Sequence, residues 1–140
     1  MTPKLNLFAA SGPVILEKIN GQLCALLNKH KVTNKKPNPK WQFCGGRVEN
    51  FDQTLEAVAK REFNEEMGAT VEIGQLIDVT IIKTEEKRTG ILIHYLSKRL
   101  GEIIPGKEIA EWKWFPVNKL PKDCASNVNP VINKALKLIK

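Results

Sequence analysis

Short stretches of apolar residues, several of them alternating with polar ones, indicate that much of this chain forms β-strands. Residues 14–19 and 22–27 are two such stretches, and the Asn20-Gly21 pair between them favours the tight turn of a β-hairpin. Further strands are predicted over residues 41–43, 75–83, 91–97 and 112–115. A basic stretch with two prolines, residues 29–40, predicts a surface loop, and an alternative role for it is to face the phosphates of a ligand.

Helical spacing of apolar residues appears twice, from Thr54 to Met67 and from Asn129 to Lys140. The first helix has apolar residues every fourth position along one face: Leu55, Ala59, Phe63 and Met67, with Val58 alongside. Gly68 suits the left-handed conformation that ends a helix, and Pro130 suits the first turn of the second helix. Mixed strands with one internal and one terminal helix indicate an α/β or α+β sandwich.

Composition is that of an ordinary globular protein, with 140 residues, 42% hydrophobic and 26% charged. We expect one domain over residues 1–140, and no apolar run is long enough to cross a bilayer. The start of the chain is faintly signal-like, but Gly12-Pro13 interrupts it, so we expect no signal peptide. The three cysteines, Cys24, Cys44 and Cys124, lie far apart and predict reduced thiols in a cytoplasmic protein.

The chain is basic, with 22 Lys and Arg against 15 Asp and Glu, a net charge of +7. A basic surface suits a polyanionic partner, either the phosphate chain of a nucleotide or a nucleic acid. Simple solubility is the alternative explanation. Net charge alone does not distinguish these three cases.

Three acids near the end of the first helix, Glu62, Glu65 and Glu66, are the strongest chemical feature. At roughly 100° per residue they share one side of the helix, beside its apolar stripe. Like charges at this spacing repel, and the helix dipole disfavours negative charge at a C-terminus. A bound divalent cation would remove the conflict, whereas an ordinary solvated acidic face is the alternative. The pair Gly45-Gly46 favours the cation, because glycines allow a backbone to approach a ligand closely.

These segments resemble the signature of the Nudix hydrolase family, Gx5Ex7REUxEExGU, in which U is an aliphatic or aromatic residue. The residues from Arg61 to Gly68 match every fixed position of its second half, and Gly46 matches its first glycine. The surrounding strands also resemble a Nudix domain. The resemblance implies an α/β/α sandwich with a mixed β-sheet, and a pyrophosphohydrolase that cleaves a nucleoside diphosphate linked to another group.

The resemblance also implies roles for individual residues. Glu62, Glu65 and Glu66 would hold Mg²⁺ (or Mn²⁺) together with the carbonyl of Gly46 or of Gly45. Glu65 and Glu66 would thereby be catalytic, and Arg61 would orient the loop before the helix by an ion pair. A later carboxylate would act as the general base, either Glu108 or Glu111, with Glu108 favoured by its neighbours Gly106-Lys107.

The first half of the signature departs from the family pattern. One residue too many lies between Gly46 and Arg61, so the position of the family's glutamate falls on Asp52 when counted forward and on Gln53 when counted back. Asp52 or Glu49 would have to replace that glutamate. Cys44 stands where many relatives have proline.

Within the family, residues 41–43, 105–108 and 129–132 resemble the MutT-like branch, whose substrates are nucleoside triphosphates and often an oxidised purine such as 8-oxo-dGTP. The resemblance then implies a substrate site of four residues: Phe43, Arg47, Asn127 and Asn129. A core role for Phe43 and helix-capping roles for the asparagines are the alternatives. Trp112, Trp114 and Phe115 are predicted either to stack on a ligand or to pack in the interior.

Two other functions remain alternatives at this stage. The missing glutamate is compatible with a Nudix-fold module that binds nucleotides with weak or no catalysis. The basic loop and the net charge are compatible with RNA-end processing or RNA binding, although the resemblance favours a small-molecule nucleotide.

Overall fold

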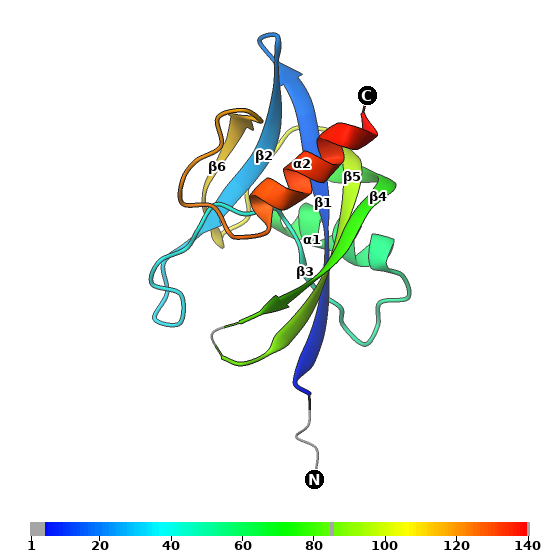
Figure 1. The fold of residues 1–140 in the computed structure, drawn as a ribbon, viewed down its shortest axis with the longest axis vertical. Coiled ribbons are helices and arrows are strands. Elements are labelled where there is room, and N and C mark those ends of the chain that lie inside the picture. Colours follow the sequence, from blue (N-terminus) through cyan, green and yellow to red (C-terminus); the bar gives the residue numbers. More distant parts are fainter. Residues whose placement is uncertain (1–4, 85, 140) are drawn as a thin grey trace.

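Strands of a mixed sheet lie between two helices in the computed structural model, which describes residues 5–84 and 86–139 (Figure 1). The elements are β1 (Leu7–Ile19), β2 (Gln22–His30), β3 (Gly46–Arg47), α1 (Leu55–Met67), β4 (Thr70–Lys83), β5 (Thr89–Leu100), β6 (Ile109–Pro116) and α2 (Val128–Leu138). Figure 1 shows α2 crossing in front of the sheet and α1 behind it. The predicted α/β sandwich with a mixed sheet is confirmed.

The long strand β1 is the centre of the sheet, whose strand order is β4-β5-β1-β2-β6. Along one edge β1 pairs in parallel with β5, from Leu7 opposite Thr89 to Ile15 opposite Ser97. Along its other edge it pairs with β2 over residues 16–19 and with the short strand β3 at Ala10 and Ser11. The glycine pair that precedes α1 is thereby held against the middle of the sheet.

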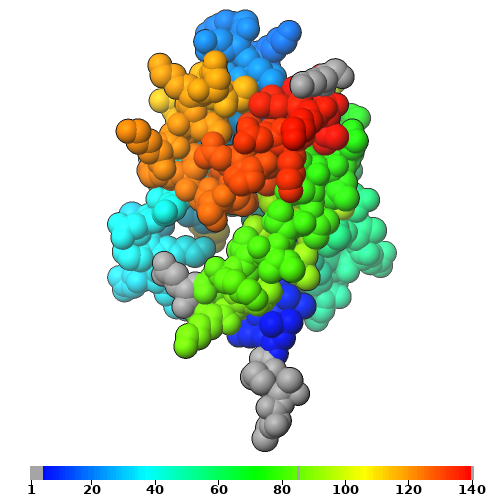
Figure 2. Space-filling view, viewed as in Figure 1, coloured from blue at the N-terminus to red at the C-terminus, as the bar shows by residue number. Residues whose placement is uncertain are grey.

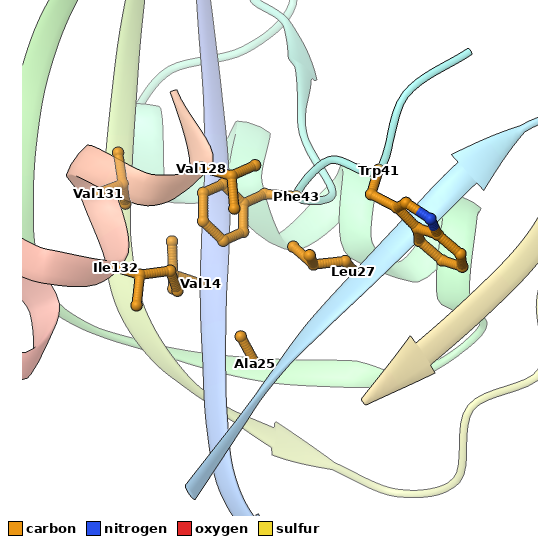
Figure 3. Close-up of a cluster of buried hydrophobic side chains, with 8 residues drawn as sticks. All are labelled: Val14, Ala25, Leu27, Trp41, Phe43, Val128, Val131 and Ile132. Atoms are coloured by element: carbon orange, nitrogen blue, oxygen red, sulfur yellow. The ribbon is translucent and has the colours of Figure 1, made fainter. Parts of the chain in front are cut away.

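The core has two layers, one on each face of the sheet, because successive side chains along a strand point to opposite faces. On one face Val14, Ala25 and Leu27 pack against α2 (Figure 3). On the other face Ile15 and Leu26 pack against α1. The residues of α2 in the first layer are Val128, Val131 and Ile132, and those of α1 in the second are Phe63 and Met67.

The predicted helix α1 is confirmed, and both of its ends have a local cause. Thr54 accepts a hydrogen bond at its Oγ1 from the backbone N–H of Ala57, at 3.0 Å, which fixes where the helix begins. Gly68 has φ 66° and ends the helix in the left-handed conformation. The predicted buried stripe is fully inaccessible at Ala59, Phe63 and Met67 and partly exposed at Leu55.

Several strand boundaries differ from the prediction. The strand predicted over residues 41–43 is wrong, because Trp41 and Gln42 form only isolated bridges, to Cys124 and Asn28, before the chain turns toward β1. Strand β4 begins at Thr70 and β6 at Ile109, both earlier than their apolar patterns suggested, because pairing with neighbouring strands extends them. Lys29 and His30 belong to β2 and not to the basic loop. Helix α2 begins at Val128, and Lys140 lies outside the described residues.

The two-layer core makes a direct prediction for a matched pair of isoleucines. Ile132, on the buried face of α2, is 1% exposed, whereas Ile81 on β4 is 68% exposed. We expect Ile132→Ala to lower the free energy of unfolding by about 2–5 kcal/mol, because it leaves a cavity. Ile81→Ala should lower it by about 0.5 kcal/mol or less. Urea denaturation followed by circular dichroism measures both, and equal losses would contradict the assignment of this core.

Candidate active site

The acidic end of α1 lines a cavity of about 250 Å³. Four carboxylate residues surround it: Glu62, Glu65 and Glu66 from the helix, and Glu108 from the loop before β6. The other lining residues are His30, Gly45, Gly106, Lys107 and Ile109. The structure therefore brings together these four acids, which the sequence analysis assigned to one candidate site, and adds a histidine to them.

Glu66 is the most enclosed of the acids, with 6% of its surface exposed. Its Oε1 accepts a hydrogen bond from the backbone N–H of Gly45 at 3.0 Å, and its Oε2 lies 2.8 Å from Nε2 of His30. These contacts tie α1 to the glycine pair and to the end of β2. Sequence reasoning missed His30 because it lies 36 positions from Glu66, and its place in a lysine-rich stretch gave no signal.

Arg61 connects the loop after β3 to the acidic helix. Its Nη2 donates to Oδ2 of Asp52 at 2.8 Å and to the carbonyl of Arg47 at 3.3 Å, and its Nη1 donates to Oε1 of Glu62 at 2.8 Å. Asp52 is also held by the backbone N–H of Glu49 at 2.7 Å. The hydrogen bonds from Arg61 and Glu49 hold the pKa of Asp52 below its ordinary value.

Asp52 therefore occupies the place of the glutamate that the family signature leads one to expect. Counting forward from Gly46 gives the residue that meets Arg61, and the alternative, Gln53, is exposed. The extra residue is absorbed between Asp52 and the N-cap at Thr54. A shorter side chain at position 52 still reaches Arg61 because the turn from Glu49 to Asp52 is closed by its own hydrogen bonds.

Glu62 lies directly against Gly46. A Cβ atom at position 46 would stand 2.2 Å from Cδ of the Glu62 carboxyl group, so any larger residue would have to displace that carboxyl group. Burial, followed by the charge of Glu66, raises the pKa of Glu62, while Arg61 opposes that rise. A carboxylate pressed against a backbone and crowded by a second carboxylate is a group that gains from an additional positive charge.

The loop before β6 brings Glu108 to the acidic end of α1. The backbone N–H groups of Ile104 and Gly106 donate to the carbonyls of Met67 and Glu66, at 2.7 and 2.9 Å, and so satisfy the exposed end of the helix. Glu108 follows on the same loop and lines the cavity. The other candidate base, Glu111, lies on β6 opposite Lys29 and is not among the lining residues.

The donor groups at this cavity fit a hard divalent cation. Four carboxylates supply oxygen ligands of the kind that Mg²⁺ takes, and Gly45 of the glycine pair lines the same cavity, whereas Gly46 contacts Glu62 without being among the lining residues. Within residues 5–84 and 86–139, no group of three or more acidic, histidine or cysteine side chains is arranged, as it stands, to hold a metal ion. Glu62 and Glu66 are instead directed to Arg61 and His30.

A second, larger cavity of about 560 Å³ adjoins the acidic one, and His30 and Gly45 line both. Figure 2 shows the hollow between the cyan loop after β2 and the green hairpin of β4 and β5, beneath the orange segment that leads into α2. Its lining includes a group of cationic side chains: Lys35, Lys36, Arg47 and Arg88. Of these four cations, only Arg47 was among the substrate residues implied by the sequence. Lys35 and Lys36 show that part of the basic loop faces the cavity.

Three of the four substrate residues implied by the sequence line this larger cavity: Phe43, Arg47 and Asn127. Phe43 also belongs to the core beneath α2, so its two suggested roles coincide. Asn127 stands at the N-cap position of α2 but makes no capping hydrogen bond with its side chain. Asn129 is exposed on α2 and is not among the residues lining either cavity.

None of the three aromatic residues of β6 lines either cavity, and two of them, Trp114 and Phe115, pack against the core. Phe115 meets Trp41 edge to face with ring centroids 4.8 Å apart, and Trp114 packs on the α1 side of the core. Trp112 is 36% exposed. Cys44 is buried, and its sulfur accepts a hydrogen bond from Nδ2 of Asn28 at 3.3 Å, so the residue in the usual proline position has a packing role.

The sequence model of the NUDIX domain family matches residues 9–135 of this chain. The chain belongs to the NUDIX domain family. The prediction of a hydrolase of this family is confirmed. No protein with a curated description matches the chain.

Solved structures show the same fold. The MutT NUDIX hydrolase from Burkholderia pseudomallei superposes with a TM-score of 0.77 at 22% identity, over 91% of this chain and 97% of that one. The MutT protein from Methanosarcina mazei Go1 gives 0.82 at 18% identity, over 99% of both chains. A C. elegans Ap4A hydrolase in a binary complex gives 0.78 at 18% identity, over 94% of this chain and 97% of that one. Identities of this size relate the folds alone.

Two further sequence expectations bear on the setting of this NUDIX domain. Cys24, Cys44 and Cys124 are free thiols, as predicted. None of the helices formed by residues 5–84 and 86–139 is long and apolar enough to span a membrane.

The ion pair between Asp52 and Arg61 makes a prediction for the pH dependence of stability. Because the pKa of Asp52 is lower in the folded protein than the unfolded value of about 3.9, its stabilisation is present above that pH. This stabilisation is lost as the pH falls through the pKa that Asp52 has in the folded protein. We expect Asp52→Asn to be less stable than the wild type near neutral pH, and the two free energies of unfolding to converge in acid.

Glu49→Gln is the matched control, because the contacts of Glu49 with Asp52 run through its backbone. Urea unfolding at a series of pH values measures all three proteins. A gap between Asp52→Asn and the wild type that stays constant down to the acid limit would refute the linkage.

Proposed function

We propose that this NUDIX protein is a Mg²⁺-dependent pyrophosphohydrolase that converts a nucleoside triphosphate to the monophosphate and pyrophosphate. The observation that carries the proposal is the joining of two cavities of opposite charge. An acidic cavity suits a divalent cation, a basic cavity suits phosphates and a base, and His30 and Gly45 line both. A triphosphate lying across them would have its phosphate chain next to the carboxylates.

The metal would be held by Glu62, Glu65 and Glu66 with a glycine carbonyl, that of Gly46 or Gly45. When bound, Mg²⁺ neutralises charge on the diphosphate and favours ionisation of the attacking water. Mn²⁺ has the same ligand preferences and would serve as a substitute. Arg61 orients Glu62 by a direct hydrogen bond and holds the loop before α1 through its hydrogen bond to Asp52. It does not contact substrate in this proposal.

The reaction requires water to attack one phosphorus of the diphosphate linkage while the bridging P–O bond breaks. In this proposal Glu108 takes the proton of that water; its position in the lining of the acidic cavity, on the loop that caps α1, supports this role. Lys35, Lys36 and Arg47 line the basic cavity and would bind the phosphates that carry the negative charge of substrate and product.

For the base, we propose Phe43 as the packing surface and Asn127 as the hydrogen-bonding group, in the manner of the MutT-like branch. Both line the larger cavity, and Phe43 keeps 7% of its surface exposed. An oxidised purine such as 8-oxo-dGTP belongs to this substrate class. Asn129 has no place in the proposal because it lies outside both cavities.

Two observations favour this function over the alternatives raised by the sequence. A carboxylate does face Arg61, supplied by Asp52, so the altered signature no longer argues for a module without catalysis. Lys35 and Lys36 of the basic loop line the cavity that would take the nucleotide, so their charge is accounted for without RNA. The free thiols fit a cytoplasmic setting.

The proposal is tested by product release from a panel of nucleoside triphosphates, dinucleoside polyphosphates and nucleotide sugars with Mg²⁺. We expect turnover of at least one triphosphate, abolished by a chelator and restored by Mg²⁺. Glu65→Gln and Glu66→Gln should each lower kcat by about 10²–10³-fold, the loss typical of removing one electrostatic stabiliser of a transition state. Absence of turnover across the panel, or full activity in both variants, would eliminate the proposal.

The choice of general base is tested by a matched pair on the same segment, Glu108→Gln and Glu111→Gln. We expect Glu108→Gln to lower kcat by about 10²–10⁴-fold, the usual contribution of a positioned base, with a small effect on KM. Glu111→Gln should retain wild-type kcat. The opposite order would transfer the role to Glu111, and equal activity in both would exclude either as the base.

A further inference from the structure

A chain of polar side chains links α2 to the larger cavity across β4 and β5. Nζ of Lys134 donates to Oδ2 of Asp78 at 3.1 Å, and Oδ1 of Asp78 lies 2.8 Å from Nδ1 of His94. Nε2 of His94 lies 3.0 Å from Nδ2 of Asn127. Asp78 and His94 are paired neighbours on β4 and β5, with exposed fractions of 9% and 4%. Neither residue has a part in the metal site or in the proton transfer described above.

The carboxylate at one end of this chain fixes the tautomer of His94. An ionised carboxylate only accepts hydrogen bonds, so Nδ1 of His94 must carry a proton to bond with Asp78. Burial lowers the pKa of His94, and the charge of Lys134 lowers it further, against the opposing effect of Asp78. The ring is therefore neutral near pH 7 and has its single proton on Nδ1. Nε2 is then an acceptor.

An accepting Nε2 in turn fixes the orientation of the Asn127 amide. Only the NH₂ group of Asn127 can donate to Nε2, so Oδ1 is the end of the amide that is not used by His94. Asn127 is partly exposed and lines the larger cavity together with His94. The edge-to-face contact of Phe43 with His94, at a centroid separation of 5.7 Å, holds the ring from the side of the cavity.

We propose that Asp78 and His94 are positioning residues that set the polarity of Asn127, so that its Oδ1 faces the larger cavity and accepts a hydrogen bond from an N–H group on the edge of the bound base. Adenine offers its 6-amino group for this contact, and guanine offers its 2-amino group and its N1–H. The proposal rests on the nucleotide function proposed above and names the base chemistry that the site reads. Lys134 strengthens the arrangement, because an ammonium group can pair only with an acceptor on Asp78.

Asp78→Asn is designed to reverse the direction of the hydrogen bonds that run from position 78 through His94 to Asn127. Lys134 still requires an acceptor, so the introduced amide should direct its oxygen to Lys134 and its NH₂ group to Nδ1 of His94. His94 must then carry its proton on Nε2, and Asn127 must rotate its amide to present the NH₂ group to the cavity. Asp123→Asn is the matched control, because Asp123 pairs with Lys29 outside this chain.

The tautomer is read directly by ¹⁵N NMR of the imidazole rings, which is tractable because the chain has 2 histidines. Asp78→Asn should convert His94 from the Nδ1–H to the Nε2–H form, with no change in His30, and the control should match the wild type. An Nε2–H ring in the wild type, or an unchanged ring in Asp78→Asn, would overturn the proposal. This measurement does not depend on any enzymatic activity.

Base selection is measured by calorimetric binding of nucleoside monophosphates without divalent metal. Purine riboside monophosphate has no N–H group on its base, whereas AMP has the 6-amino group and GMP has the 2-amino group and N1–H. We expect the wild type and Asp123→Asn to bind AMP or GMP about tenfold more tightly than purine riboside monophosphate, the size of one good base contact. Asp78→Asn should abolish or invert that preference. Equal or tighter binding of purine riboside monophosphate by the wild type, or an unaltered preference in Asp78→Asn, would refute the assignment.

If Asp78→Asn fails to fold, Asn127→Asp tests the same series of hydrogen bonds from the end at Asn127. A carboxylate at position 127 has no N–H for Nε2, so His94 should become doubly protonated and stay so to higher pH than in the wild type. A His94 titration like that of the wild type would count against the chain. Failure of all turnover with intact base selection would remove the hydrolase function and leave this inference standing.

Discussion

Repulsion among carboxylates at the end of α1 is the constraint around which the site is organised. Helix geometry forces Glu62, Glu65 and Glu66 together where the helix dipole is also unfavourable. The protein answers with groups from four separate segments: Arg61 on Glu62, His30 and the Gly45 N–H on Glu66, and the N–H groups of the late loop on the last helix carbonyls. The unfavourable energy of crowding the acids is thus offset by hydrogen bonds that connect β2, the glycine pair and the loop before β6 to one helix end.

The same contacts explain why both cavities meet where they do. β1 pairs with β3 and β5 on opposite edges, so the glycine pair lies between the sheet and α1 and forms the boundary between an acidic and a basic cavity. The wall of the larger cavity on the other side is built by residues of the β4–β5 hairpin and of the loop after β2. Acidic and basic side chains are thus separated by one loop, which is the arrangement that the proposed binding of a polyphosphate requires.

Local features of the sequence were enough to predict α1, its cap at Gly68 and the grouping of its acids, because helical periodicity acts over a few residues. The sequence left Asp52 and Gln53 as alternatives, since the answer depends on where Thr54 begins the helix relative to the turn before it. The bridges at residues 41–42, the contact of His30 with Glu66, and the chain from Lys134 to Asn127 join distant segments. No pattern in any one of those segments signals its partner.

β1 cannot complete its pairing until the first 97 of the 140 residues are present, because Leu7 is paired with Thr89 and Ile15 with Ser97. The β1–β2 hairpin is local and can form early, but the half of β1 that carries Ser11 and Gly12 lacks its parallel partner until β5 has been synthesised. Such long-range pairing slows folding and leaves an apolar strand edge open in the meantime. The glycine pair contacts that same half of β1, so the arrangement of the candidate site cannot be completed before β5 has been synthesised.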